Sequence, residues 1–376
     1  DQYDTPATGY GLNAAFQGRD GPLAWEVGAD VRLTDGTEHE RFRNMNGVFT
    51  RDREAGGKTL VAGAYVEAAY VEGPWIATGG VRLDRSRAYD AVRRERDTTT
   101  GEVLLDQHAP GRSDTTPTGR IGLRYAVSDA LYLRGAAYAG FRAPTLNELH
   151  RPFRVGNDIT EANPELKPET LQGVEFGLGG EGPVRWSVDV FWNRLKDPIA
   201  NVTIGFGPGT FPTAGFVPAG GTLRQRRNAG EIRAWGVEGE ASGDIGAMLA
   251  WRAAMAYTDA EVHGGSDLPQ LTGLRPAQTP KWTLTGGFDL RPIDPLRLSA
   301  DLRYESARWE DDLNSRRLSA GLQVDARAAW RLTDAAEAYV AVDNLFDSKL
   351  EVGETGDGVE SFAAARTVRI GFSYRR

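Results

Sequence analysis

Apolar and polar residues alternate along most of this chain with a period of two. From Leu318 to Leu332 every second residue is apolar, and most of the residues between them are polar or charged. The stretches 184–192 and 296–304 repeat the pattern. Because successive side chains of a strand point to opposite faces, this period predicts β-strands with one apolar and one polar face.

About 15 such segments occur along the chain, with bounds set to within about two to four residues. Many reach 12 residues or more, whereas strands of soluble proteins usually have about five or six. A tilted strand needs about 9–11 residues to cross a bilayer, so these segments are long enough to do so. The predicted strands are 10–17, 23–34, 60–72, 75–90, 118–127, 131–142, 171–179, 184–196, 226–242, 248–263, 281–290, 296–309, 318–332, 336–345 and 365–375.

The connections between these segments alternate between short turns and longer loops. An up-and-down sheet with this alternation carries its tight turns at one rim and its long loops at the other, as outer-membrane barrels do. The short turns are predicted at 18–22, 73–74, 128–130, 180–183, 243–247, 291–295 and 333–335. The longer loops are predicted at 35–59, 91–117, 143–170, 197–225, 264–280, 310–317 and 346–364.

The predicted fold class is therefore all-β, an antiparallel up-and-down transmembrane β-barrel. Aromatic residues favour it, because Trp25 and Trp330 lie near short turns while Trp192 and Trp282 lie near long loops. With 15 strands, the first and last run in the same direction and cannot close an antiparallel barrel. We therefore expect an odd number of further strands before Asp1 in the parent protein.

Composition narrows the classes of function. Lysine and arginine number 44 against 52 aspartates and glutamates, and the net charge of −8 argues against a nucleic-acid surface. The chain has no cysteine, so it can form neither a disulfide nor a thiolate metal site. It has no run of 18 apolar residues that would predict a transmembrane helix, and no visible signal peptide.

No catalytic constellation stands out, and the Gly-x-Ser-x-Gly, His-Glu-x-x-His and phosphate-loop patterns are absent, so we expect no enzyme, no cofactor and no metal centre. Carboxylates are abundant on the predicted polar faces, where their expected role is to hydrate the barrel interior. These are Asp189, Glu238, Glu240, Asp301 and Asp325, with Arg185, Arg303 and Arg327 as expected partners.

Arginine and aromatic residues recur in the predicted outside loops. Guanidinium groups beside aromatic rings would suit an anionic, partly apolar chelate. Contact with lipopolysaccharide phosphate, or solubility alone, is the alternative interpretation. The candidate ligand-binding residues are Arg41, Phe42, Arg43, His150, Arg151, Phe153, Arg154, Phe206, Phe211, Arg226 and Arg227.

Two boxes resemble a signature of TonB-dependent outer-membrane receptors. The first is Phe141-Arg142-Ala143-Pro144, and the second runs from Asn163 to Glu169 with the sequence Asn-Pro-Glu-Leu-Lys-Pro-Glu. Proline ends a central strand and holds the residue before it in extended geometry, which predicts a structural role for both boxes. That role is assigned to Phe141, Arg142, Ala143, Pro144, Asn163, Pro164, Leu166, Pro168 and Glu169.

Two further segments are similar to the end of that family's barrel. Val342 to Asp347 resembles its penultimate strand and exit loop, and Arg366 to Tyr374 resembles its final strand. The resemblance implies one partial barrel domain over residues 1–376, with about 15 of 22 strands, and no plug domain or energy-coupling box in this sequence. It also implies an outer-membrane location, energy from TonB, and contact with lipid, lipopolysaccharide, the plug and a small iron-chelate ligand, but not with nucleic acid.

His150 lies between the two boxes, where haem receptors of the family have a similarly placed histidine. A solvated loop histidine is the plainer interpretation. The leading functional hypothesis is a receptor for scarce solutes, with a siderophore-type iron chelate as the first candidate and haem or cobalamin as the next. A passive diffusion porin and a soluble all-β binding protein remain as alternatives.

Overall fold

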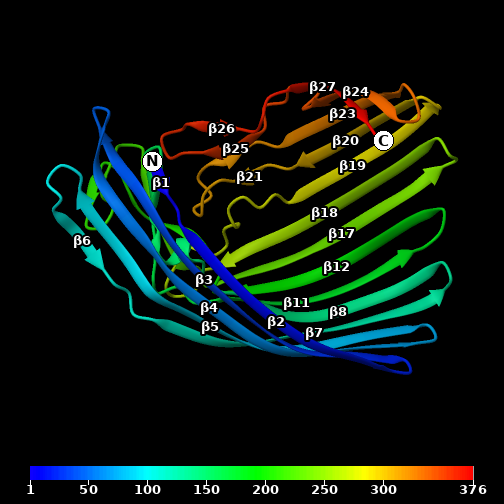
Figure 1. Cartoon of the computed structure of the whole chain (residues 1–376), viewed down its shortest axis with the longest axis horizontal. Helices are drawn as coiled ribbons and strands as arrows, with labels where there is room; N and C mark the ends of the chain where they lie inside the picture. The colour runs from blue at the N-terminus through cyan, green and yellow to red at the C-terminus, as the bar shows by residue number, and fades with distance from the viewer. Residues whose placement is uncertain (376) are drawn as a thin grey trace. The chain divides into compact units, whose positions relative to one another are not determined.

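The computed structural model describes residues 1–375, and most of this length is β-strand (Figure 1). Within it, one antiparallel sheet contains 17 strands, of which 15 have eight or more residues and match the 15 predicted segments. They are β2 (Ala7–Asp20), β3 (Leu23–Met45), β4 (Val48–Glu72), β5 (Trp75–Asp97), β7 (Arg112–Ser128), β8 (Leu131–Arg142), β11 (Glu169–Gly180), β12 (Val184–Lys196), β17 (Glu231–Ile245), β18 (Leu249–His263), β19 (Trp282–Ile293), β20 (Leu296–Glu305), β23 (Gly321–Arg331), β24 (Ala336–Asp343) and β27 (Thr367–Tyr374).

Shorter elements belong to the long loops or to the ends of the large sheet. The large sheet is completed by β1 (Gln2–Asp4) and β6 (Val103–Gln107). A four-stranded sheet contains β9 (Phe153–Val155), β10 (Asp158–Glu161), β13 (Ile199–Phe206) and β16 (Thr222–Asn228). The two-stranded pairs are β14 (Gly209–Phe211) with β15 (Gly215–Val217), β21 (Arg308–Trp309) with β22 (Arg317–Leu318), and β25 (Glu351–Glu354) with β26 (Glu360–Phe362).

Two short helices complete the secondary structure of residues 1–375. They are α1 (Leu146–His150) and the 3₁₀ turn η1 (Pro269–Leu271). No helix in this part of the chain combines the length and the apolar character needed to span a membrane.

The chain groups into two compact units. The first contains Asp1–Leu123, Ala137–Gln172 and Leu195–Glu231, and the second contains the remaining described residues. The first unit therefore holds β1–β6 and the two loops that follow β8 and β12. In each unit the short turns lie at one end of the strands, as the alternation of loop lengths predicts (Figure 1). Gly21, Gly73 and Gly246 occupy these turns with positive φ, which glycine adopts without a steric penalty.

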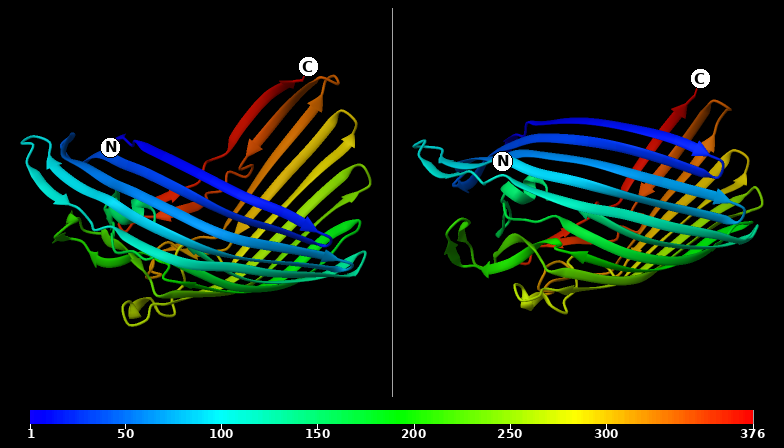
Figure 2. Two further views of the ribbon diagram at one scale, coloured as in Figure 1. Left: turned by 60° about the horizontal axis from the view of Figure 1, so that its bottom comes forward. Right: turned by 90° about the horizontal axis from the view of Figure 1, so that it is seen from below.

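The prediction of a long loop at 35–59 is wrong. β3 and β4 pair in one register from Leu23↔Tyr70 to Met45↔Val48, with only the Arg43–Thr50 position unpaired, and only Asn46-Gly47 connects them (Figure 2). Both turn residues have positive φ, as a tight hairpin turn requires. Arg41 and Phe42 are therefore strand residues, and Arg43 lies in the same strand.

Charge pairing explains why the strands continue where the apolar face stops. Arg53 lies opposite Glu40 on one side and opposite Glu95 on the other, and Arg51 lies opposite Asp97. Cross-strand pairs of opposite charge stabilise a ladder that has no apolar face to bury. The loop predicted at 91–117 is also shorter in the structure, since β5 continues to Asp97 and β7 begins at Arg112. The same charge pairing stabilises the extension of β5.

The exposure of the strand faces is the reverse of that in a soluble protein. In β5, Val81 and Leu83 keep 63% and 56% of their surface exposed, whereas Asp84 and Ser86 keep 2% and 8%. Trp25 and Trp330 are also among the exposed apolar residues. Soluble proteins rarely expose a continuous apolar face, and a lipid environment is the one in which such a face is stable.

Ion pairs cover the polar faces, although not between the partners that we expected. Asp189 binds Arg134 at 2.6 Å rather than Arg185. Arg327 binds Glu337 at 2.7 Å, and Arg303 binds Glu305 two residues along its own strand. On the neighbouring strand β23, Arg303 faces the uncharged Gln323, while Asp301 faces Asp325. Arg303 therefore has no carboxylate directly opposite it on that strand.

A charge placed on the exposed apolar face should destabilise the protein in lipid. Val81→Lys puts an ammonium group near the middle of the apolar stretch of β5, and we expect a loss of about 2–4 kcal/mol in the free energy of unfolding. The measurement is urea unfolding of the natural gene product in lipid vesicles, with Val81→Leu as the control. Equal stability of the lysine and leucine variants would contradict a lipid-facing assignment.

Candidate functional site

The loops 143–168 and 197–230 of the first unit fold into a cluster with its own sheet and a small core. In this sheet β16 pairs with β13 on one side and with β10 on the other, and β9 pairs with β10. Ile159, Val217 and Leu223 form the buried core, and Phe211 packs against it. Phe211 is therefore part of the core rather than an exposed ligand contact.

The first box fixes the start of this cluster. Arg142 donates hydrogen bonds to Glu148 at 2.8 Å and to Glu169 at 2.6 Å. Thr145 caps α1, and Glu148 accepts a hydrogen bond from the Thr145 backbone N–H in return, which forms a capping box. Burial works against ionisation, but the bonds from Arg142 and Thr145 hold the pKa of Glu148 below its ordinary value. Thr145-x-x-Glu148 is a helix-start signal that the sequence carries.

The second box is held by a side chain that the sequence analysis missed. The Asn228 side chain accepts the Lys167 N–H at 2.9 Å and donates to the carbonyl oxygens of Lys167 and Asp197 at 3.0 and 2.8 Å. Asn163 donates to the Arg226 carbonyl at 3.0 Å, and Glu169 accepts the Ile199 N–H. The polar residues of the box thus connect both loops, as a structural role requires.

The apolar box residues lie next to α1. Leu166 and Pro168 are buried, and Phe141 is half-buried at the end of β8. A cavity of about 40 Å³ lies under the helix, between the first box and strands β4, β5 and β7. Box residues that line it are Ala143, Pro144, Pro164 and Leu166.

His150 faces this cavity and is not a solvated loop residue. It lies at the end of α1 with 8% of its surface exposed, and its Nε2 atom is enclosed without a hydrogen-bond partner among residues 1–375. Burial lowers the pKa of His150 to about 4, because the charged imidazolium would lose its hydration. The interpretation as a solvated histidine is therefore wrong.

A chain of buried charges connects the cluster to the strands beneath it. Arg53 binds Glu40 at 2.5 Å and Glu95 at 2.9 Å, and Arg93 binds Glu95 at 3.0 Å and Glu161 at 2.9 Å. Sequence reasoning missed this network as a unit. The signal for it was the alternation of acidic and basic residues in the extended strands, which positions opposite charges across neighbouring strands.

Several predicted ligand-binding residues take part in structural contacts instead. Arg226 donates to the Arg151 carbonyl at 2.8 Å and also to the Asn147 carbonyl, with its guanidinium 5.1 Å from the Phe153 ring centre. Arg151 pairs with Glu38. Phe42 lies under the Arg53 guanidinium at 3.9 Å, and Arg227 donates to Gln225 at 2.8 Å.

The remaining predicted residues present their side chains to solvent. Arg41 stacks on Tyr3 at 5.0 Å, Arg43 is exposed with a φ of 58°, and Arg154 is exposed and donates to the Gly156 carbonyl. Phe206 keeps 64% of its surface exposed. The eleven candidates therefore divide into an anchored group and an exposed group of Arg41, Arg43, Arg154 and Phe206.

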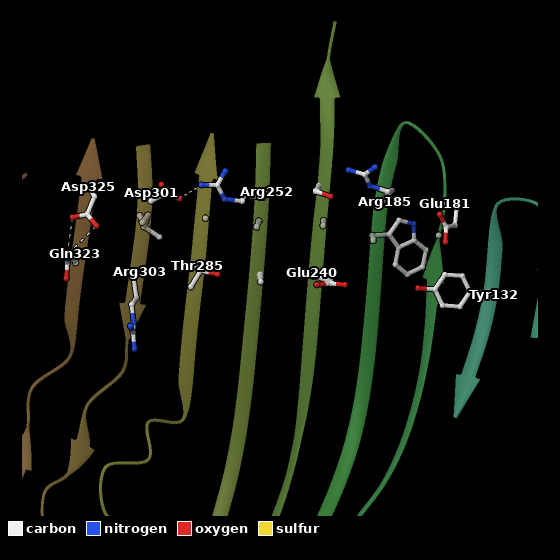
Figure 3. Close-up of a pocket in the computed structure, with 18 residues that line it drawn as sticks. Tyr132, Glu181, Arg185, Glu240, Arg252, Thr285, Asp301, Arg303, Gln323 and Asp325 are labelled. Atoms are coloured by element: carbon white, nitrogen blue, oxygen red, sulfur yellow. Dashed lines mark hydrogen bonds and ion pairs between the residues drawn. The ribbon is translucent and has the colours of Figure 1, made fainter. Parts of the chain in front are cut away.

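The second unit has a hollow of about 820 Å³ on its polar face. Figure 3 shows acidic and basic side chains interspersed along it, including Arg252 paired with Asp301. Glu240 accepts the Ser187 hydroxyl at 3.3 Å. Among residues 1–375, no group of three histidines or carboxylates is arranged to hold a metal ion. The lining of this hollow therefore presents side chains of both charges.

Removal of the Asn228 side chain should loosen the second box. Asn228→Ala deletes three hydrogen bonds, each worth about 1 kcal/mol, so we expect about 2–3 kcal/mol less protection of the Lys167 amide. Hydrogen exchange with mass spectrometry measures this loss. Asn228→Asp keeps the acceptor and should show an intermediate effect. If Lys167 exchanged at the same rate in all three proteins, Asn228 would not be the connecting residue.

Acid should weaken the attachment of α1. The His150 pKa is about 4 when folded and near 6.5 when the loop opens, so stability present above pH 6.5 is lost as the pH falls toward 4. The loss by pH 5 should be about 2 kcal/mol. It is measured as hydrogen exchange of residues 146–150 after correction for intrinsic rates. His150→Leu should remove the pH dependence, and persistence of that dependence in the leucine variant would assign it to another group.

Comparison with known proteins identifies the family. A family model described as "TonB dependent receptor-like, beta-barrel" matches residues 1–345. An iron-regulated outer membrane virulence protein of Vibrio cholerae is 29% identical over 236 aligned positions, and the match covers 60% of this chain and 34% of that protein. The vitamin B12 transporter BtuB of Photobacterium profundum is 24% identical over 292 residues, covering 77% of this chain and 40% of the transporter. The chain thus spans less than half the length of these relatives.

Solved structures agree with this assignment. The ferric yersiniabactin uptake receptor FyuA from Yersinia pestis has a TM-score of 0.75 at 18% identity, with 98% of this chain and 54% of the receptor covered. The copper transporter OprC has a TM-score of 0.76 at 17% identity, with 98% and 57% covered. At sequence identities of 17–18%, structural similarity establishes a shared fold. Together with the family match, it confirms that the chain belongs to the TonB-dependent receptor family and has the fold of that family's outer-membrane β-barrel domain.

Proposed function

We propose that this chain is the barrel part of a receptor that binds an iron chelate of the siderophore class outside the cell and imports it with energy from TonB. The family match over residues 1–345 is the observation that carries the import function. The iron-regulated protein of Vibrio cholerae and the ferric yersiniabactin receptor support iron as the cargo. In this proposal the plug and the TonB contact lie elsewhere in the full-length protein.

The exposed group supports an anionic chelate as the ligand. Arg41, Arg43 and Arg154 have no carboxylate partner within ion-pair distance among the described residues, and Phe206 adds an exposed ring. A guanidinium retains its charge at any physiological pH and recognises carboxylate and phenolate oxygens directionally. The arginines of the anchored group, by contrast, already bind partners within the protein: Arg226 binds backbone carbonyls, Arg151 binds Glu38, and Arg227 binds Gln225. We therefore assign ligand contact to the exposed group.

Haem and cobalamin are the second candidates. BtuB relatives transport vitamin B12, and a hemin receptor of Yersinia enterocolitica is 32% identical over 102 residues. Haem ligation would need an accessible histidine nitrogen, and the enclosed Nε2 of His150 makes that residue a poor candidate. A passive porin fits the relatives less well because they are receptors and transporters, and a soluble protein does not fit the exposed apolar faces.

Neutralising the exposed arginines should weaken chelate binding. For the pair Arg43→Gln and Arg154→Gln we expect an affinity for an anionic ferric siderophore about tenfold lower, since each lost charge contact weakens the complex. Binding of radioactive ferric chelates to whole cells measures it, with a panel of catecholate, hydroxamate and citrate complexes. Arg19→Gln, which removes one exposed arginine near a short turn, is the control for loss of positive charge away from the loops.

The same assay separates the alternatives. Import, but not binding, should stop in cells that lack TonB. If the cells bound cobalamin or haem specifically and bound none of the iron chelates in the panel, the siderophore assignment would be wrong. The assignment to the receptor family would still hold. Import that continues without TonB would overturn the energised mechanism.

A further inference from the structure

The exposed face of β5 changes abruptly from apolar to basic. After Trp75, beside the short turn, the face carries Val81 and Leu83 and then Arg85 and Arg87. Ten residues separate Trp75 from Arg85, which is about 33 Å at about 3.3 Å per residue. A tilt of about 40° reduces this to about 25 Å, the height of the apolar band of an outer-membrane barrel. Arg85 and Arg87 therefore lie at the far boundary of that band, on the long-loop side.

A hollow of about 330 Å³ lies at this boundary, entirely within the first unit. Its apolar side is formed by Leu60 and Ala62 of β4, which pair with Arg87 and Arg85. Gly111, Arg112 and Ser113, at and just before the start of β7, line the other side. The hollow therefore combines apolar side chains of β4 with the guanidinium groups of the β5 residues directly opposite them.

The two arginines have no acidic partner within ion-pair distance among residues 1–375. Arg85 donates to the Ser113 hydroxyl at 3.3 Å, and Arg87 lies 5.0 Å from the Tyr89 ring centre. Arg82 on the polar face of the same strand is instead bound by both Asp30 and Asp84. The polar face of β5 thus balances its charge internally, and the lipid-side face does not.

The neighbouring charges leave this positive site intact. Lys58, one row above, lies 3.2 Å from Asp90 and 3.7 Å from Asp35, so both of those carboxylates already have a cation. Two adjacent guanidinium groups without carboxylates attract an anion with several oxygens, and phosphate matches their paired N–H donors. The long-loop side of an outer-membrane barrel faces outward, so the nearest anions are the phosphates of outer-leaflet glycolipid.

We propose that Arg85 and Arg87 bind the phosphorylated headgroup of a lipopolysaccharide molecule. Its phosphate lies in the hollow between β4 and β7, and its acyl chains lie along Leu83 and Val81. This site depends on the outer-membrane location of the chain and not on the identity of the imported solute. It would hold one lipid in place against the barrel wall.

The test is native mass spectrometry of the detergent-purified natural gene product titrated with lipid A. The double variant Arg85→Gln/Arg87→Gln should bind lipid A about tenfold more weakly than the unmodified protein. The charge-preserving variant Arg85→Lys/Arg87→Lys should retain part of the affinity. Arg19→Gln, which removes one positive charge near a short turn, should bind like the unmodified protein. Circular dichroism of each variant shows that it is folded.

Two further ligands distinguish a lipid site from a general phosphate site. Dephosphorylated lipid A should bind the unmodified protein no better than it binds the double glutamine variant. Inorganic phosphate at the concentration of the lipid should not compete, because it lacks the acyl chains that contact Leu83. Equal lipid A binding by the folded glutamine variant, or equal competition by inorganic phosphate, would overturn the proposal.

Discussion

The constraint on which this structure depends is that a backbone in lipid must satisfy its hydrogen bonds within the protein. The long strands do this by pairing with their neighbours, residue by residue, over distances that cross a bilayer. With the backbone satisfied, the side chains are free to divide by polarity. The apolar face of β5 is exposed and its polar face is covered by ion pairs, which is the arrangement that lipid on one side and water on the other select.

Outside the bilayer the same ladder is stabilised by different side chains. The extensions of β3, β4 and β5 exchange apolar residues for rows of opposite charge, and the buried chain from Glu40 to Glu161 carries this pairing into the loop cluster. A buried charge without a partner is destabilising, so each buried arginine between Glu40 and Glu161 needs the carboxylate that it binds. The loops are consequently held by fixed charge pairs and by the two boxes, and the exposed arginines remain available for other partners.

The sequence analysis predicted the crossing strands well because lipid and water impose an alternation that is visible residue by residue. It failed at 35–59, where the alternation is between acid and base and looks like a polar loop. It also grouped Arg226 with Arg43, although one donates to backbone carbonyls and the other is exposed. Composition alone cannot separate these cases, because the partners of Arg226 are backbone atoms far away in the sequence. Thr145-x-x-Glu148, in contrast, was a local signal from which the helix start could have been predicted.

The environment of each arginine therefore decides its role more than its position in a loop or a strand does. Arg82, between two carboxylates, is neutralised and belongs to the polar face. Arg53, buried between Glu40 and Glu95, connects strands and would be destabilising without them. Arg85 has neither burial nor a carboxylate, and it lies where the apolar band ends. The inward-facing Arg82 and Arg53 are paired within the protein, whereas Arg85 faces outward without a carboxylate. The counterion of Arg85 must then come from its surroundings, and in an outer membrane the surrounding anions are those of lipid.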